Sequence, residues 1–224
     1  MNYLFLSNTN LFRGIKEDEI KKILSCMNSY EQEYKRDEII YRAGDSVNNI
    51  GLVLRGSVNI VVNFYWGNSN IFGHIESGKI FAETYAAVPG KELLVDVVAA
   101  EDCTILFLNM DKLLTVCQSG CSFHQRLIHN LLRISAMKNL NLSSRMMHTA
   151  SKSTRVRLLS YFSELAIENG SASFTVPFSR QQLADYLGVE RSALSNELSK
   201  MQKDGLIKYH KNKFKLFQNE DNYE

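Results

Sequence analysis

The sequence predicts an α+β fold. It has three parts: an N-terminal antiparallel β-roll of the cupin-like jelly-roll kind (1–118), a long helix (119–149) and a C-terminal winged helix-turn-helix (150–224). Short β-branched and aromatic runs, separated by glycines, fill residues 39–108 and are typical of a roll. A helical apolar period then continues to about Thr149, and two short helices joined by a glycine turn lie between Ser179 and Gly205.

The totals fit a two-domain globular protein. A chain of 224 residues can bury two cores, and its 45% hydrophobic and 22% charged residues are ordinary values. No run of about 18 apolar residues could cross a bilayer. The N-terminus resembles no export signal, so we expect a cytoplasmic protein with no membrane partner. The four scattered cysteines suggest reduced thiols more than a disulfide framework.

Charge is distributed unevenly along the chain. Residues 1–118 carry 15 acidic side chains against 11 basic ones, whereas 119–149 carry four basic side chains and no acidic one. Residues 150–224 carry 11 basic and nine acidic side chains. A nucleic acid would therefore be expected to bind the C-terminal half.

The N-terminal part should begin with helix and continue as strands. Residues 1–35 have apolar residues at roughly helical spacing and acids near a helix start. From Asp37 the spacing of the apolar residues changes from helical to that of short strands. The predicted strand runs are IIY, IGLVL, VNIVVNFYW, IFGHI, LLVDVV and TILFL.

A long helix should follow from Asp111 to about Thr149. Its apolar stripe consists of Leu127, Leu131, Ile134 and Met137. The rest of the domain offers too little surface to cover such a stripe, so we expect a twin helix from a second subunit to cover it in a two-fold homodimer. The alternative is a core helix packed on the roll.

The next stretch is a capped helix, a turn and a second helix. Ser179 with Gln182 three residues later is typical of a capping box at a helix start. Gly188 allows a left-handed turn. In the second helix Leu194, Leu198 and Met201 fall on one side and face inward.

The opposite side of that second helix is small and polar. It carries Arg191, Ser192, Ser195, Asn196 and Ser199. Short polar side chains beside one arginine suit a helix lowered into the major groove of double-stranded DNA, where arginine pairs with guanine. A solvated face on a core helix is the alternative, but the cap, turn and face together favour DNA binding.

Two further elements complete this region. Residues 151–170 predict a helix that ends at Asn169-Gly170, with an apolar side made of Val156, Leu159, Phe162, Leu165 and Ala166. The run LIKYHKNKFKLF predicts a two-stranded wing whose lysines could contact phosphates. The expected DNA contacts outside the second helix are Arg180, Gln181, Lys211 and Lys213.

The order of roll, long helix and winged helix-turn-helix resembles the Crp/Fnr superfamily of bacterial transcription regulators. The most similar stretches are RQQLADYLGVERSALSNELSKMQKDGLI and, in the roll, GKIFAETYAAVPGKELLVDVVAAEDCTILFL. The resemblance implies a homodimer joined along the long helix, with RNA polymerase as a further partner. An effector in the roll would re-aim two recognition helices into major grooves about 34 Å apart.

The roll departs from the cyclic-nucleotide members of that family. Their cassette continues from Gly-Glu to an Arg-Ser or Arg-Thr pair, whose arginine neutralises the cyclic phosphate; here Ala82-Glu83 and Leu93-Leu94 stand in those places. A buried phosphate without a cation is costly, so we predict no tight binding of cyclic AMP or cyclic GMP. The unknown effector, if one exists, should be uncharged or aromatic. Its expected pocket is Phe81, Ala82, Glu83, Leu93, Leu94 and Leu127.

No cofactor or metal is expected. Iron–sulfur members use several closely spaced N-terminal cysteines, but only Cys26 precedes Cys103 here. His74 lies near the place of a haem ligand in some relatives, and a lone histidine is more often structural. Cys117 and Cys121, one helical turn apart, suit a redox switch or half a metal site, and we favour small apolar filling.

The face that would read DNA also departs from the family pattern of Glu, two residues, then Ser-Arg. Ser192 takes the place of the Glu, Ser195 keeps the Ser and Asn196 replaces the Arg, so the half-site should differ; Arg191 is the first candidate for a base contact. An enzyme of the metal-dependent cupin kind is disfavoured because residues 39–108 contain only one histidine. A constitutive DNA-binding protein with a vestigial roll remains open.

Overall fold

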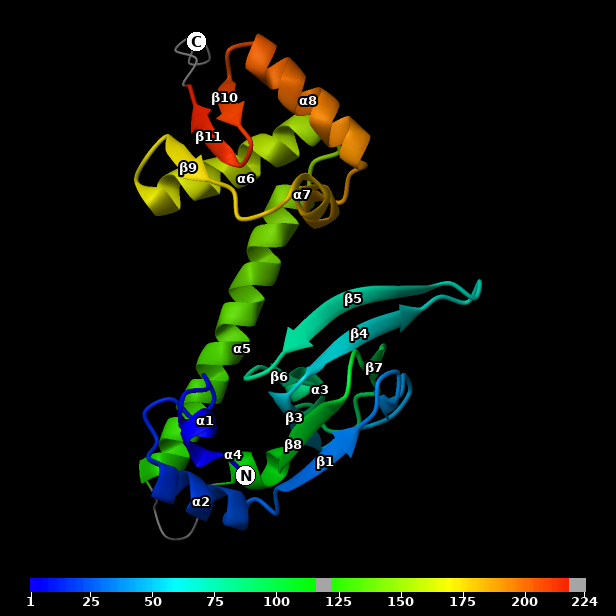
Figure 1. The fold of residues 1–224 in the computed structure, drawn as a ribbon, viewed down its shortest axis with the longest axis vertical. Helices are drawn as coiled ribbons and strands as arrows, with labels where there is room; N and C mark the ends of the chain where they lie inside the picture. Colours follow the sequence, from blue (N-terminus) through cyan, green and yellow to red (C-terminus); the bar gives the residue numbers. More distant parts are fainter. Residues whose placement is uncertain (116–121, 218–224) are drawn as a thin grey trace. The chain divides into compact units, whose positions relative to one another are not determined.

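The computed structural model describes residues 1–115 and 122–217. The chain forms two compact units, Met1–Met137 and Lys138–Glu224. Figure 1 shows the elements of both units, and each unit is described here by itself.

The first unit is built around two antiparallel sheets. One has the order β1-β8-β3-β6, formed by Tyr30–Tyr34, Cys103–Asn109, Asn49–Arg55 and Ile80–Phe81. The other has the order β2-β7-β4-β5, formed by Ile39–Tyr41, Asp96–Ala99, Ser57–Asn63 and Ser69–Glu76. This pairing of early with late strands is that of a jelly roll and confirms the predicted class.

Strands β3 and β8, at the centre of the first sheet, are buried on both faces. Alternate residues such as Ile105 and Phe107 point between the two sheets, where they meet Val58 and Val97. The residues between them, such as Leu106, belong to a second core cluster formed with helices. Burial on both faces explains why the run ILFL in β8 is apolar without interruption.

Two details of the roll differ from the sequence prediction. Residues 30–34 form strand β1 and are not helical, because Tyr30 and Tyr34 contact the Phe107 ring from an edge strand paired with β8. Strand β4 ends at Asn63, so the tip residues Phe64, Tyr65 and Trp66 lie outside it and are exposed. Both runs are short, and neither period is clear over so few residues.

Helices cover the face of β3 and β8 that points away from the other sheet. They are α1 (Tyr3–Ser7), α2 (Glu17–Cys26), α4 (Met110–Leu114) and the first part of α5 (Ser122–Thr149). Leu127 and Leu131 are buried in this cluster, and Ile134 packs against it. The expectation that these residues lie uncovered was therefore wrong: their own domain covers the stripe, while Met137 beyond it is exposed.

A second apolar face of α5 is exposed. Leu132, Leu140 and Met147 are 64%, 59% and 64% accessible. With Ala136 and Ser143 they follow intervals of four, four, three and four residues, which place all five within about 80° of the helix circumference at 100° per residue. This is the spacing of a seam between paired helices.

The second unit contains the predicted winged helix-turn-helix. Its helices are α6 (Thr154–Asn169), α7 (Arg180–Leu187) and α8 (Arg191–Lys203), and its sheet has the order β10-β11-β9, formed by Ile207–His210, Lys213–Leu216 and Ser173–Thr175. Helix α6 ends at Gly170 in the left-handed conformation, as predicted. Its buried residues are Leu158, Tyr161 and Phe162, whereas Val156 is exposed and was wrongly assigned to the inner side.

Candidate nucleic-acid interface

The turn between α7 and α8 has the geometry that the sequence predicts. The Ser179 hydroxyl accepts from the Gln182 backbone N–H, and the Gln182 side chain accepts from the Ser179 N–H at 2.9 Å. Gly188 follows α7 with φ 64°, a conformation that a residue with a Cβ resists. The capping box and the glycine thus set where α7 begins and ends.

Helix α8 presents two chemically different sides. Leu194, Leu198 and Met201 are fully buried in the core of the second unit. The exposed side carries the five predicted residues Arg191, Ser192, Ser195, Asn196 and Ser199. Among the residues that the structure describes, none forms a hydrogen bond or ion pair with the Arg191 side chain. The side chain is therefore available to an outside partner.

An ion pair on the inner side fixes α8 to α6. Arg155 Nε lies 2.5 Å from Glu197 Oε1, and its Nη2 lies 2.7 Å from Asp204 Oδ2. The hydrogen bond to Glu197 is the main reason that the pKa of Arg155 is raised. Both carboxylates lie on or just after α8, so one guanidinium links the middle and the end of the recognition helix to α6.

The wing is a tight hairpin with basic side chains. Lys211 occupies its turn with φ 55°, and the Asn212 carbonyl accepts from the Val176 N–H at 2.8 Å. Lys208, Lys211, Lys213 and Lys215 are exposed. The predicted hairpin is confirmed, and β9 adds a third strand to it.

Arg180 is bonded to the wing. Its Nη2 donates to the Lys211 carbonyl at 2.8 Å, and its guanidinium lies 5.0 and 5.2 Å from the ring centroids of Tyr209 and Phe214. Burial lowers the pKa of this side chain. Gln181, the other expected contact at this helix start, donates to Asp185 at 2.8 Å on the surface.

Replacing Arg180 with alanine should therefore loosen the wing. We expect a loss of about 1–3 kcal/mol in unfolding free energy, because a charged hydrogen bond and two cation–π contacts disappear. Chemical denaturation checks this, with Gln181→Ala as the control at the neighbouring exposed position. Equal, small losses in both variants would show that Arg180 does not support the wing.

Two protein-family models match the sequence of this chain. Residues 31–119 match the cyclic nucleotide-binding domain, and residues 156–218 match the Crp-like helix-turn-helix domain. The chain belongs to the Crp/Fnr superfamily of transcription regulators. Together the two matches include most of the roll and nearly all of the winged helix-turn-helix.

Curated Crp/Fnr relatives are similar over most of their length. The CRP-like protein Clp of Xanthomonas campestris is 23% identical over 190 residues, which cover 80% of each chain. The transcriptional activator protein FnrL of Cereibacter sphaeroides is 21% identical over 189 residues, covering 80% of this chain and 72% of the relative.

Solved structures show the same fold. The c-di-GMP responsive regulator CLP of X. campestris has a TM-score of 0.52 at 20% identity, covering 89% of this chain and 98% of that one. CprK complexed with OCPA has a TM-score of 0.60 at 14% identity, covering 88% and 89%.

In this Crp/Fnr member the expected effector residues do not gather at one place. Phe81 is buried between the sheets, where its ring occupies the position that a Cβ on Gly51 would need. Ala82 adopts φ 61° just before helix α3 (Glu83–Ala86), and Glu83 is buried. Leu127 belongs to the separate core beneath the helices.

The leucine pair is divided between core and surface. Leu93 is buried and exchanges backbone hydrogen bonds with Gly44 and Asp45, whereas Leu94 is 70% exposed. A buried leucine thus stands near the place where cyclic-nucleotide members of the superfamily carry a cation. The leucine pair therefore provides no positive charge for a phosphate.

The residues considered for haem or metal binding are His74, Cys117 and Cys121. His74 is exposed, and its Nδ1 lies 2.8 Å from Asn59 Oδ1. Cys117 and Cys121 lie outside the described residues. Within residues 1–115 and 122–217, no group of three or more His, Cys, Asp or Glu side chains could hold a metal ion. No helix in that part of the chain is long and apolar enough to cross a membrane.

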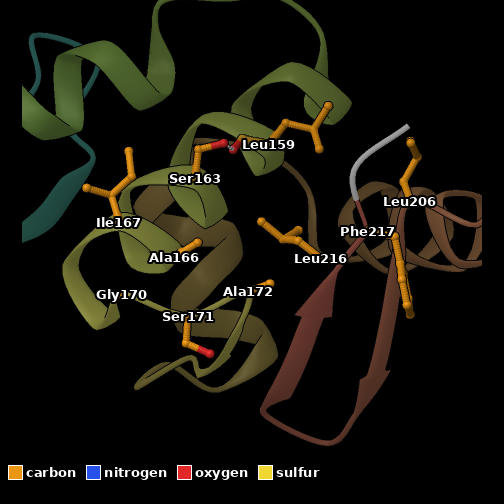
Figure 2. Close-up of a pocket in the computed structure, with 10 residues that line it drawn as sticks. All are labelled: Leu159, Ser163, Ala166, Ile167, Gly170, Ser171, Ala172, Leu206, Leu216 and Phe217. Carbon is orange, nitrogen blue, oxygen red and sulfur yellow. Dashed lines mark hydrogen bonds between the residues drawn. The ribbon is translucent and has the colours of Figure 1, made fainter. Parts of the chain in front are cut away.

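An apolar groove of about 710 Å³ lies elsewhere in the winged helix-turn-helix. Figure 2 shows its lining, which comes from α6, the connection after it, and the wing strands with the residues beside them: Leu159, Ser163, Ala166, Ile167, Gly170, Ser171, Ala172, Leu206, Leu216 and Phe217. The lining contains no charged side chain, so the groove lacks the cations that a DNA backbone requires.

Sequence reasoning missed several tertiary contacts of this interface. Arg145, Arg157 and His148 hold α7 from neighbouring helices. The excess of basic residues on the long helix was visible in the sequence. The partners of Arg126 and Arg145 are backbone carbonyls, however, and no sequence pattern indicates such partners.

Proposed function

We propose that this Crp/Fnr regulator is a homodimer that binds double-stranded DNA sequence-specifically and controls transcription in the cytoplasm with RNA polymerase as a further partner. The observation that carries the proposal is the exposed polar face of α8, with Arg191 available at its first turn. N-terminal residues of a recognition helix are those that contact base edges in this class of motif.

The exposed face of α5 supports the homodimer. Leu132, Leu140 and Met147 form an apolar seam that a second copy of the same helix would cover. A two-fold axis along this seam would present two α8 helices to one duplex. Half-sites about one helical turn apart would then match the symmetry of the protein.

Arg191→Ala is the direct test of base reading. We expect it to cost about 1–3 kcal/mol on a duplex selected by the wild-type protein from a randomised library, and much less on random-sequence DNA, because arginine pairs with guanine O6 and N7. Fluorescence anisotropy at fixed salt measures both affinities. Equal losses on the two duplexes would make Arg191 a phosphate contact.

The effector is proposed to be something other than cyclic AMP or cyclic GMP. Leu93 and Leu94 stand where the family's phosphate-neutralising arginine is expected, and a phosphate held without a cation is costly. The CLP relative is described as responsive to c-di-GMP and CprK was solved with OCPA, so the fold accommodates different ligands. An uncharged or aromatic effector fits this chain best.

Isothermal titration with cyclic AMP and cyclic GMP checks that proposal. We expect no binding in the micromolar range for either nucleotide, and micromolar affinity would contradict the proposal.

Operator affinity measured with and without cell extract separates a gated regulator from a constitutive one. A shift with extract supports gating, whereas an unchanged affinity supports a constitutive regulator with a vestigial roll.

A further inference from the structure

The end of α7 is held by side chains from two other helices. Arg145 on α5 donates from Nε to the Tyr186 carbonyl at 3.2 Å and from Nη2 to the Asp185 carbonyl at 3.3 Å. Arg157 on α6 donates from Nη1 to the carbonyls of Leu187 and Gly188 at 2.7 and 3.0 Å. We call these two arginines the carbonyl clamp.

The carbonyl clamp completes the hydrogen bonding of a helix end. The last carbonyls of a helix have no partner within it. Here the Ala184 and Asp185 carbonyls accept from the backbone of the turn, and the clamp supplies donors for those that follow. Positive charge at a helix C-terminus is also favourable because of the helix dipole. The turn that leads into α8 is thus fixed at successive peptide groups.

A polar cluster around the buried His148 holds the Arg145 side of the clamp in place. His148, one turn after Arg145 on α5, is 2% exposed. Its Nε2 donates to Glu164 Oε2 at 2.6 Å, and its Nδ1 lies 3.0 Å from the Tyr186 hydroxyl. The other Glu164 oxygen accepts from the Ser144 hydroxyl at 2.8 Å. The C-terminal turns of α5 are therefore bonded to both α6 and α7.

Tyr186 joins this cluster to the clamp. Its carbonyl accepts from Arg145, its ring lies 5.6 Å beneath the Arg145 guanidinium, and its hydroxyl meets His148. Burial raises the pKa of Tyr186, which keeps the hydroxyl protonated as a donor to the histidine. Backbone, ring and hydroxyl of one α7 residue are thus all fixed by α5.

We infer that Arg145 and Arg157 are positioning residues for DNA recognition, which set the aim of α8 by holding the carbonyl end of α7. The inference rests on the proposed DNA-binding function. It adds that base discrimination depends on two arginines that need not touch DNA. Their guanidinium fork is required, because Arg145 uses Nε and Nη2 on two consecutive carbonyls, and Arg157 donates from Nη1 to α7 while its Nε donates to the Ser151 carbonyl at 2.6 Å. A lysine ammonium is a point charge without that geometry.

The test uses variants of the full chain that preserve charge. Arg145→Lys and Arg157→Lys are compared with Arg42→Lys, an exposed arginine of the roll that lies outside both the clamp and the α5 seam. The probes are the duplex selected by the wild-type protein and a random-sequence duplex of equal length. We expect each clamp variant to weaken binding to the selected duplex about tenfold, to leave random-duplex binding within about twofold, and to keep the salt slope. The control should change neither affinity.

A second variant keeps the inference testable if a clamp variant fails to fold. Tyr186→Phe keeps the ring and removes only the hydroxyl that contacts His148. We expect it to lower the ratio of selected to random affinity about threefold, with both affinities measured well below its melting temperature. A wild-type ratio in the folded clamp variants, or equal losses on both duplexes, would overturn the inference. A wild-type protein that does not distinguish the duplexes would instead refute the proposed function.

Discussion

A glutamate in place of Leu140 is expected to convert the protein into a monomer with at least about hundredfold weaker operator binding. Leu140 lies at the centre of the exposed α5 face, where a second copy would bury a carboxylate against its own twin. Linking two half-site contacts raises affinity by roughly 10²–10⁴ without any new contact, and the monomer loses that gain. Sedimentation equilibrium and operator titration on the same samples measure both effects.

Leu142→Glu is the matched control for that prediction. Leu142 is 57% exposed on the same helix but is rotated about 200° from Leu140, away from the seam. It should leave both the mass and the affinity unchanged. If the Leu140 variant stays dimeric, or if both variants dissociate alike, the seam is not the dimer interface.

Phe162→Ala is expected to cost about 3–5 kcal/mol in unfolding free energy of the winged helix-turn-helix. Phe162 is fully buried, with ring centroids of Phe214 and Phe174 at 4.7 and 5.7 Å. Its removal leaves a cavity between α6 and the wing sheet. Urea denaturation followed by circular dichroism measures the loss, and DNA binding should weaken as the folded fraction falls.

Ile167→Ala provides the comparison on the same helix, because Ile167 is 80% exposed. Its unfolding free energy should change by less than about 0.5 kcal/mol. A Phe162 variant that loses no more than this would show that the three phenylalanines do not form the core of the domain.

Local patterns predicted the helix-turn-helix well. The Ser179 and Gln182 cap, the Gly188 turn and the inward side of α8 each depend on residues a few positions apart. The jelly-roll class also followed from short runs and glycines. Such features require only nearby residues to agree, so one sequence is enough to place them.

Long-range packing was less predictable. Helix α5 has two apolar faces. The sequence alone did not show that the first domain covers the face with Leu127 and Leu131, nor that the face with Leu140 is exposed. Arg180 was predicted to contact DNA, but its hydrogen bond to the Lys211 carbonyl, 31 residues away, was not foreseen. Strand β1 was missed because its pairing with β8 joins distant segments.

The central claim is that two copies of this chain read one duplex through their α8 helices. Selection of binding sites from a randomised duplex library, using the full-length protein, tests it most directly. We predict a two-fold symmetric sequence with half-site centres about 10 base pairs apart, bound by two chains per duplex. Enrichment of no sequence, or of a single asymmetric site bound by one chain, would contradict it.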